Sequence, residues 1–211
     1  MQSWVRLGMF ALPCSGLLGT ISVLLPRVFI DPSVDPRGFA EASGSIGLGN
    51  MLGIGALVLW LVGIQALYSL LSGMSVGRWA LVALILSFVG IGLFLPLAGI
   101  LAFAAPVAGR AYMNGDQNAI SLIADSIALS NPSALLFGGL SVLLFIVGSM
   151  IFGIVIWRCE VLPRWAGIIY AVAGTLSFLS APLYNFTVAL FGGLLLLISG
   201  AWISASITKR K

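Results

Sequence analysis

The sequence predicts an all-α fold, a polytopic membrane helix bundle of six transmembrane helices, from its composition and its long apolar runs. Hydrophobic residues make up 60% of the 211-residue chain and charged residues 8%, and the mean hydropathy is +1.15. Soluble domains carry about a quarter charged residues, so this composition indicates an integral membrane protein. The apolar runs are continuous, which favours membrane helices over the short alternating strands of a barrel.

Six runs are long enough to cross the roughly 30 Å hydrocarbon layer, which takes about 20 helical residues. The predicted spans are residues 4–25, 46–71, 79–103, 134–157, 165–183 and 186–207, all within a single domain, 1–211. The first span resembles the start of a secretory signal. No small-residue cleavage site follows it and the apolar run continues to Leu25, so we expect it to be retained.

The basic residues fall mainly on the side of the membrane that carries both termini. The predicted topology places on that side Arg6, Arg78, Arg158, Arg164, Lys209, Arg210 and Lys211, and on the opposite side Arg27, Arg37 and Arg110. By the positive-inside rule both termini are cytoplasmic. The net charge of +4 is then explained by topology and headgroup contacts, and no nucleic-acid partner is expected.

Two spans share a pattern that fits three hairpins in one orientation with an internal repeat. Arg-Trp-Ala opens both spans, at Arg78 and Arg164, and a Pro-Leu pair follows at Pro96 and Pro182. Arg and Trp anchor a helix at the cytoplasmic interface, and the proline follows about 25 Å further along. The pattern therefore marks one membrane crossing, although independently acquired anchors explain it equally well.

The segment 145–180, "FIVGSMIFGIVIWRCEVLPRWAGIIYAVAGTLSFLS", resembles the second half of a family of small bacterial multi-spanning membrane proteins known only as a domain of unknown function. In that family a glycine-bearing span ends in a short polar loop, and a Val/Leu-Pro-Arg-Trp motif opens the next span. The span 53–71 and the acidic loop after the first span also fit. The resemblance implies the helical architecture and a bacterial inner membrane, and it brings no activity or catalytic residues.

Polar residues of the second span are the candidates for lining an internal cavity. Asn50 and Gln65 lie about four turns apart, roughly on one face, and Tyr68 follows one turn later. A lipid-facing amide would leave its hydrogen-bonding groups unpaired. Hydrogen bonding between helices is the favoured role of these amides, and if the bundle holds a cavity we expect Asn50, Gln65 and Tyr68 to be the candidate ligand-binding residues that line it.

The long segment between the third and fourth spans predicts a short external helix at about 116–129. Three isoleucines recur there at helical spacing, Asn114 or Asp116 precedes them as a cap, and Asn131 with the following proline ends the helix. We expect this helix to lie in the membrane interface. The alternative is a lid over the outer mouth of the bundle.

Charged residues of the external loops are the candidates for an enzyme site. They are Asp31, Asp35, Glu41, Arg110, Asp116 and Asp125, together with Arg27 and Arg37. Paired carboxylates can transfer protons or hold Mg²⁺, but their spacing matches no phosphotransferase, protease or cyclase, and solvated loop charges explain the same residues. The chain has no histidine, so we expect no catalytic residues, no metal and no cofactor.

The sequence therefore favours a non-catalytic structural, lipid-associated or lipophilic small-molecule-binding component of the bacterial inner (plasma) membrane. The expected partners are membrane lipids and a lipophilic small molecule, and homo-oligomerisation stays open. The alternatives are a membrane enzyme with an externally facing carboxylate site and a facilitative small-solute permease. Ion-coupled transport is disfavoured because Arg6, near the start of the first span, is the only charged residue inside the predicted spans.

Single cysteines at two loop positions test the predicted orientation. In a chain without Cys14 and Cys159, a membrane-impermeant thiol reagent added to intact cells should label Gly115→Cys and leave Ser72→Cys unlabelled. The positive-inside rule places only position 115 outside. Labelling at position 72 alone would reverse the topology.

Overall fold

The structure, a computed structural model, describes residues 3–25, 28–128 and 130–208, and within these ranges the chain forms helices joined by short turns. The N-terminal helices are α1 (Ser3–Leu24), α2 (Pro36–Leu71) and α3 (Gly77–Gly99). The π-helical segment η1 (Ile100–Ala104) joins α3 to α4 (Ala105–Met113). The chain then forms α5 (Ala119–Ile127), α6 (Pro132–Ala134), the π-helical segment η2 (Leu135–Gly139), α7 (Leu140–Arg158), α8 (Arg164–Leu183) and α9 (Phe186–Thr208).

Within the described residues, six helical stretches are long and apolar enough to cross a membrane. This confirms the predicted all-α bundle and defines a multi-pass membrane protein. The second and third stretches are longer than predicted. The second begins at Pro36 rather than residue 46, and the third continues through η1 to Met113 rather than ending at residue 103. The N-terminal part of α2 carries the charged residues Arg37 and Glu41, so the prediction of spans from continuous apolar runs does not include this part of the helix.

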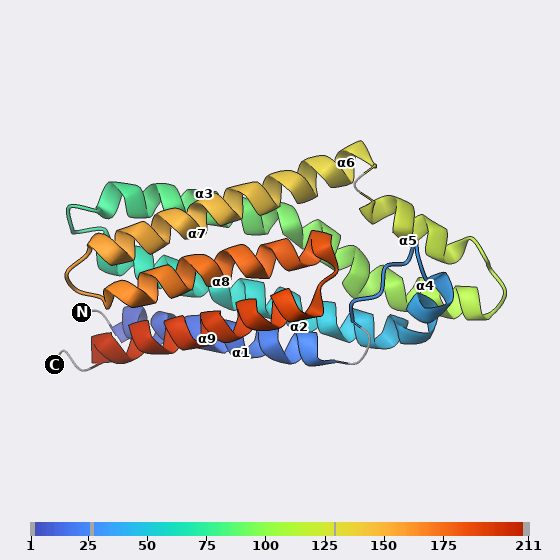
Figure 1. The fold of residues 1–211 in the computed structure, drawn as a ribbon, viewed down its shortest axis with the longest axis horizontal. Coiled ribbons are helices and arrows are strands. Elements are labelled where there is room, and N and C mark those ends of the chain that lie inside the picture. Colours follow the sequence, from blue (N-terminus) through green and yellow to red (C-terminus); the bar gives the residue numbers. More distant parts are fainter. Residues whose placement is uncertain (1–2, 26–27, 129, 209–211) are drawn as a thin grey trace.

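The six stretches form a closed ring. Around the ring α2 packs on α1, α1 on α9, α9 on α8, α8 on α7 and α7 on α3, and α3 with η1 and α4 returns to α2. α1 begins and α9 ends at the same end of the bundle, which we call the terminal end (Figure 1). The opposite, distal end carries α4 and α5.

Glycines bring neighbouring helix backbones close together around most of this ring. A Cβ added at Gly153 in α7 would lie 2.8 Å from the carbonyl oxygen of Gly167 in α8. Three serines in turn fill the space beside a glycine on the next helix: Ser87 (α3) faces Gly148 (α7), Ser149 (α7) faces Gly174 (α8) and Ser177 (α8) faces Gly192 (α9). Small residues at such contacts let helices gain van der Waals packing in lipid, where the hydrophobic effect contributes little.

Aromatic side chains fill the centre of the ring from its middle toward the terminal end. The rings of Phe145 and Phe178 stack with centroids 3.9 Å apart, and Trp60 meets Phe145 edge-on at 4.8 Å. The Trp60 indole N–H donates to the hydroxyl oxygen of Tyr170 across the ring, at 3.0 Å. These side chains are buried, and the hydrogen bond pairs two polar groups that would otherwise be stranded among apolar side chains.

α5 packs its isoleucine face against protein at the distal end, and its place relative to the membrane interface stays a prediction. Its Ile120 and Ile123 are buried in a second core with Phe39 and Ile46 of α2. The helix spans Ala119–Ile127 rather than 116–129. The predicted isoleucine face exists, but it is buried on the extensions of α2 and α4, whose presence beyond the predicted spans was not expected.

The two Arg-Trp starts occupy equivalent places at the terminal end. α3 and α8 begin beside them, and Trp79 and Trp165 are exposed on the bundle surface. The two prolines differ in their effect. α8 ends just after Pro182, whereas the helical path of α3 continues past Pro96 into η1.

The glycine contact between α7 and α8 predicts a stability difference between two Gly→Ala variants. Gly153→Ala should cost about 1–3 kcal/mol, because the new methyl group meets the backbone of α8 and overpacks the contact. Gly92→Ala is the matched control, since a Cβ there meets nothing within 4 Å. Thermal unfolding of the purified proteins, followed by size-exclusion chromatography, should show a lower midpoint for Gly153→Ala alone. Equal midpoints would contradict the packing argument.

Candidate functional site

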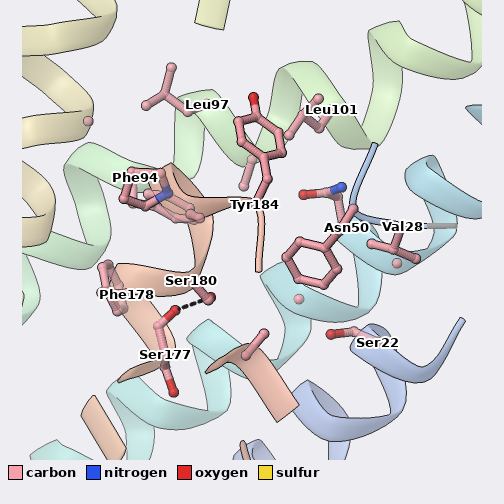
Figure 2. Close-up of a pocket in the computed structure, with 18 of the residues that line it drawn as sticks. Ser22, Val28, Asn50, Phe94, Leu97, Leu101, Ser177, Phe178, Ser180 and Tyr184 are labelled. Atoms are coloured by element: carbon pink, nitrogen blue, oxygen red, sulfur yellow. Dashed lines mark hydrogen bonds between the residues drawn. The ribbon is translucent and has the colours of Figure 1, made fainter. Parts of the chain in front are cut away.

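A cavity of about 760 Å³ lies inside the ring, from mid-depth to the distal end (Figure 2). All six membrane-crossing stretches contribute to its wall, as do the segment 28–33 and α5. Its volume falls in the range of small-molecule sites, which is roughly 300–1,000 Å³. The cavity is therefore the main candidate for a binding site.

Aromatic side chains form the floor of the cavity. Trp60 and Phe178 belong to the central aromatic packing and also line the cavity, and Phe94 lies beside Phe178 with ring centroids 5.3 Å apart. Beyond this floor toward the terminal end, Leu67 and Ile156 are fully buried. The floor separates the cavity from the terminal end of the bundle.

The serine hydroxyls of the wall are mostly engaged with backbone carbonyls. Ser15 donates to the carbonyl of Ala56 at 2.7 Å, which links α1 to α2. Ser22 donates to Gly19 in its own helix, and Ser180 donates to the carbonyl of Ser177 (Figure 2). Because these donors are already paired, the middle of the cavity presents a mainly apolar surface.

Asn50 is the predicted cavity residue that the structure places in the wall. Its amide nitrogen donates to the carbonyl of Ile46 at 2.9 Å. Among the described residues, its side-chain oxygen accepts no hydrogen bond, and the amide projects into the cavity in Figure 2. A ligand donor can therefore be bound at this oxygen.

Gln65 and Tyr68 do not line the cavity, so this part of the prediction is corrected. Gln65 is exposed on the outside of α2, and Tyr68 is half-buried against the core near the terminal end. Both residues lie between the level of the aromatic floor and the terminal end of the bundle. They therefore do not reach the cavity, although they belong to the same helix as Asn50. Gln65 lies six residues from the end of α2, where a long amide side chain can reach the headgroup region.

Tyr184 lies at the distal mouth of the cavity beside the segment that carries Asp31 and Ser33. It follows α8 with φ 44° and ψ 38°, a left-handed conformation that is uncommon for a residue other than glycine. Partial burial, followed by the nearby Asp31 carboxylate, raises the pKa of the Tyr184 hydroxyl above its usual value. The hydroxyl therefore stays protonated at neutral pH and can donate a hydrogen bond.

Part of the cavity wall near the distal end is exposed. Leu135 and Gly139 on η2 are exposed members of the wall, and so are Pro182 and Tyr184 at the end of α8. The main contacts of η2 are with α3, α6 and α7. The exposed stretch of wall between η2 and the end of α8 is therefore the candidate for a sideways opening of the cavity.

Both π-helical segments border the cavity. η1 contributes Leu101 to the wall, and η2 contributes Leu135, Gly138 and Gly139. A π segment widens a helix locally and is frequent at functional sites. Here the two segments lie on neighbouring helices at the level of the cavity.

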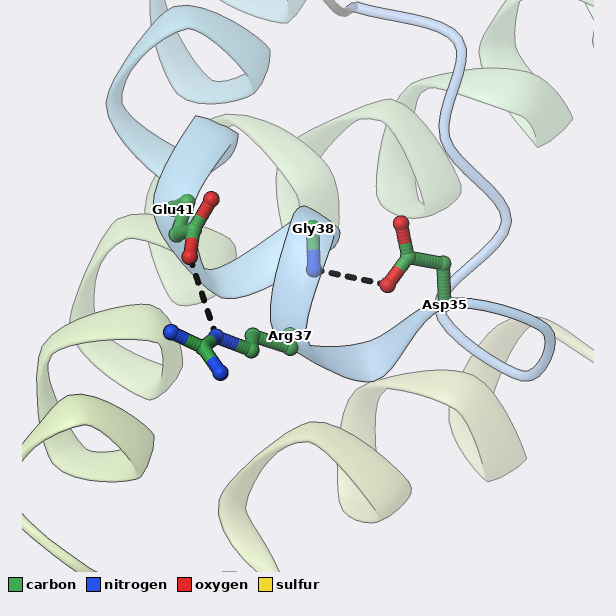
Figure 3. A network of polar contacts seen from close by, with 4 residues as sticks. All are labelled: Asp35, Arg37, Gly38 and Glu41. Atoms are coloured by element: carbon green, nitrogen blue, oxygen red, sulfur yellow. Dashed lines mark hydrogen bonds and ion pairs between the residues drawn. The ribbon is translucent and has the colours of Figure 1, made fainter.

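The charged candidates of the external loops are used for local structure. Asp35 caps α2 by accepting the backbone N–H of Gly38 at 2.8 Å, and Arg37 pairs with Glu41 at 3.1 Å (Figure 3). Asp31 accepts the N–H of Ser33, Asp116 accepts the N–H of Asn118, and Arg110 and Asp125 are exposed.

These carboxylates do not converge on the cavity. Asp31 is the member of the predicted set that lines it. Within residues 3–25, 28–128 and 130–208, no three His, Cys, Asp or Glu side chains are grouped closely enough to hold a metal ion. Arg27, another residue of the predicted enzyme site, lies outside the described residues.

Fold and cavity together define the class of protein as a multi-pass helical membrane protein with a largely apolar internal chamber. Comparison with known proteins gives no match, whether to a family model, a curated protein or a solved structure. The interpretation of the site therefore rests on its geometry and chemistry.

Several residues of the site carry no strong signal in the sequence. Trp60 and Phe178 are apolar residues within apolar spans, and the inward direction of each depends on its neighbours in the ring. Tyr184 carries the clearest signal, because a tyrosine in a very short turn between two spans lies at the depth where aromatic residues contact headgroups. The two π segments have no pattern that hydropathy would detect.

The Trp60–Tyr170 hydrogen bond predicts a difference between two Tyr→Phe variants. Tyr170→Phe should cost about 1–3 kcal/mol, because it leaves the buried Trp60 N–H without its acceptor. Tyr68→Phe is the control, because the Tyr68 hydroxyl forms no hydrogen bond with another described residue, and its effect should stay within about 0.5 kcal/mol. Thermal midpoints of both variants measure the difference, and a larger loss in Tyr68→Phe would refute this assignment.

Proposed function

We propose that this protein binds a lipophilic small molecule or membrane lipid in its distal cavity and performs no chemistry on it. The observation that carries the proposal is the cavity itself, an apolar chamber of about 760 Å³ whose wall includes residues from every membrane-crossing stretch. A mainly apolar wall accepts an apolar ligand and disfavours a polar one, because a buried polar group without a hydrogen-bond partner costs free energy.

The candidate sideways opening supports a ligand that comes from the bilayer. It lies between η2 and the end of α8, and both elements belong to stretches that can cross the membrane. The exposed neighbours of the opening include Leu135 and Leu136, which are apolar. A lipophilic molecule in the adjacent leaflet can therefore reach the cavity without passing through water.

The arrangement gives less support to the two alternative functions. A permease needs a path through the whole bundle, and the stacked rings of Phe145 and Phe178 close the centre below the cavity. An externally facing enzyme would need a second acid near Asp31, and the other carboxylates that the structure describes are engaged elsewhere or exposed.

Orientation and membrane follow from the sequence as part of the same proposal. The excess of Arg and Lys at the terminal end favours cytoplasmic termini, and the resemblance of segment 145–180 to small bacterial membrane proteins favours a bacterial inner membrane. In that orientation the cavity opens to the outer leaflet.

A pair of glycine variants tests whether the cavity is occupied. Gly53 lines the cavity and Gly92 lies on the exposed face of α3, and a Cβ at either position meets nothing within 4 Å. Gly53→Leu should fold normally, fill part of the cavity and remove a bound lipophile, whereas Gly92→Leu should retain it. Mass spectrometry of small molecules that co-purify in detergent-free polymer nanodiscs measures the difference. Identical profiles for the wild type and both variants would contradict the proposal.

A further inference from the structure

We infer that the occupant is a single-chain amphiphile with a hydroxyl-bearing, non-anionic head, an inference that rests on the proposed function. Its head lies between Asn50 and Tyr184, and its chain extends down to Trp60 and Phe178.

The polar groups available to a ligand are concentrated at one end of the cavity. Asn50, Tyr184 and Asp31 lie at the distal mouth, whereas the floor consists of Trp60 and Phe178. The hydroxyls between these levels are largely committed to backbone carbonyls. A ligand that matches this distribution has one polar end and one apolar end.

The dimensions of the cavity fit one hydrocarbon chain. Asn50 and Trp60 are ten residues apart on α2, which corresponds to about 15 Å along the helix axis. A group of the size of a water molecule takes up roughly 30 Å³, so the cavity holds about 25 such groups. This is enough for one hydrocarbon chain with a small head and too little for a whole two-chain phospholipid.

The chemistry at the mouth favours a hydroxyl-bearing, non-anionic head. The side-chain oxygen of Asn50, which accepts no hydrogen bond from another described residue, can accept one from a ligand, and the Tyr184 hydroxyl can donate to an acceptor. A head with hydroxyl groups can donate to the first and accept from the second. Asp31 is the charged residue among the described members of the wall, so an anionic head would be repelled at short range.

Photo-crosslinking in phosphatidylcholine nanodiscs tests this assignment with the full chain. Three probes carry a diazirine near the middle of a palmitoyl chain: 1-monopalmitoylglycerol, palmitate at pH 8 and dipalmitoyl phosphatidylcholine. Mass spectrometry then maps the adducts. At equal mole fraction, the monoacylglycerol should label peptides containing Trp60 and Phe178 at least fivefold more than either other probe does.

Four variants identify the contacts responsible. Asn50→Leu and Tyr184→Phe should each lower floor labelling by the monoacylglycerol by about three- to tenfold, which corresponds to one hydrogen bond. Gly53→Leu should abolish it, and Gly92→Leu should leave it unchanged. Two independent head contacts keep the test decisive if one variant does not fold.

The outcomes separate this inference from the proposal beneath it. If Gly53→Leu lowers floor labelling but palmitate or phosphatidylcholine labels as strongly as the monoacylglycerol, the head assignment is wrong and lipophile binding stands. The head assignment is also wrong if Asn50→Leu and Tyr184→Phe, both folded, change nothing. If no probe labels the floor above the level of Gly53→Leu, the inference about the head fails, and if the co-purifying molecules of the wild type and Gly53→Leu are also identical, the proposed function fails with it.

Discussion

Close contact between helix backbones, made possible by glycine, is the constraint on which the rest of this structure depends. In lipid, apolar side chains gain little by moving from hydrocarbon to protein, so helix association relies on packing distance and a few hydrogen bonds. Gly153 and Gly167 bring α7 and α8 into backbone contact, and serine–glycine pairs repeat this between α3 and α7 and between α8 and α9. Close contacts of this kind continue beside the cavity between α1 and α9, where a Cβ added at Gly193 would lie 3.1 Å from the backbone nitrogen of Thr20.

The same bundle contains two unlike halves. From mid-depth to the terminal end, aromatic rings and the Trp60–Tyr170 hydrogen bond fill the centre. Toward the distal end, π-helical turns in η1 and η2 and the short turn after α8 hold the walls apart. α5 then covers part of the open end through Ile120 and Ile123.

Sequence predicts the long-range plan of this fold better than its interior. Length and hydropathy identify all six spans because spanning a bilayer is a one-dimensional requirement. Asn50 could be identified because an amide in an apolar run needs a partner. Gln65 was wrongly predicted to line the cavity, because the same argument does not apply near a helix end, where the side chain reaches polar surroundings. Trp60, Phe178 and the π segments could not be identified, since their role arises from neighbours far away in the chain.

A chamber confined to one half of a membrane protein gives the two leaflets unequal access to it. Under the proposed function, a ligand enters between η2 and the end of α8, and the aromatic floor stops its chain from reaching the other side. Exchange with the membrane would then be one-sided. The occupancy of the chamber would follow the composition of one monolayer rather than the average content of the bilayer.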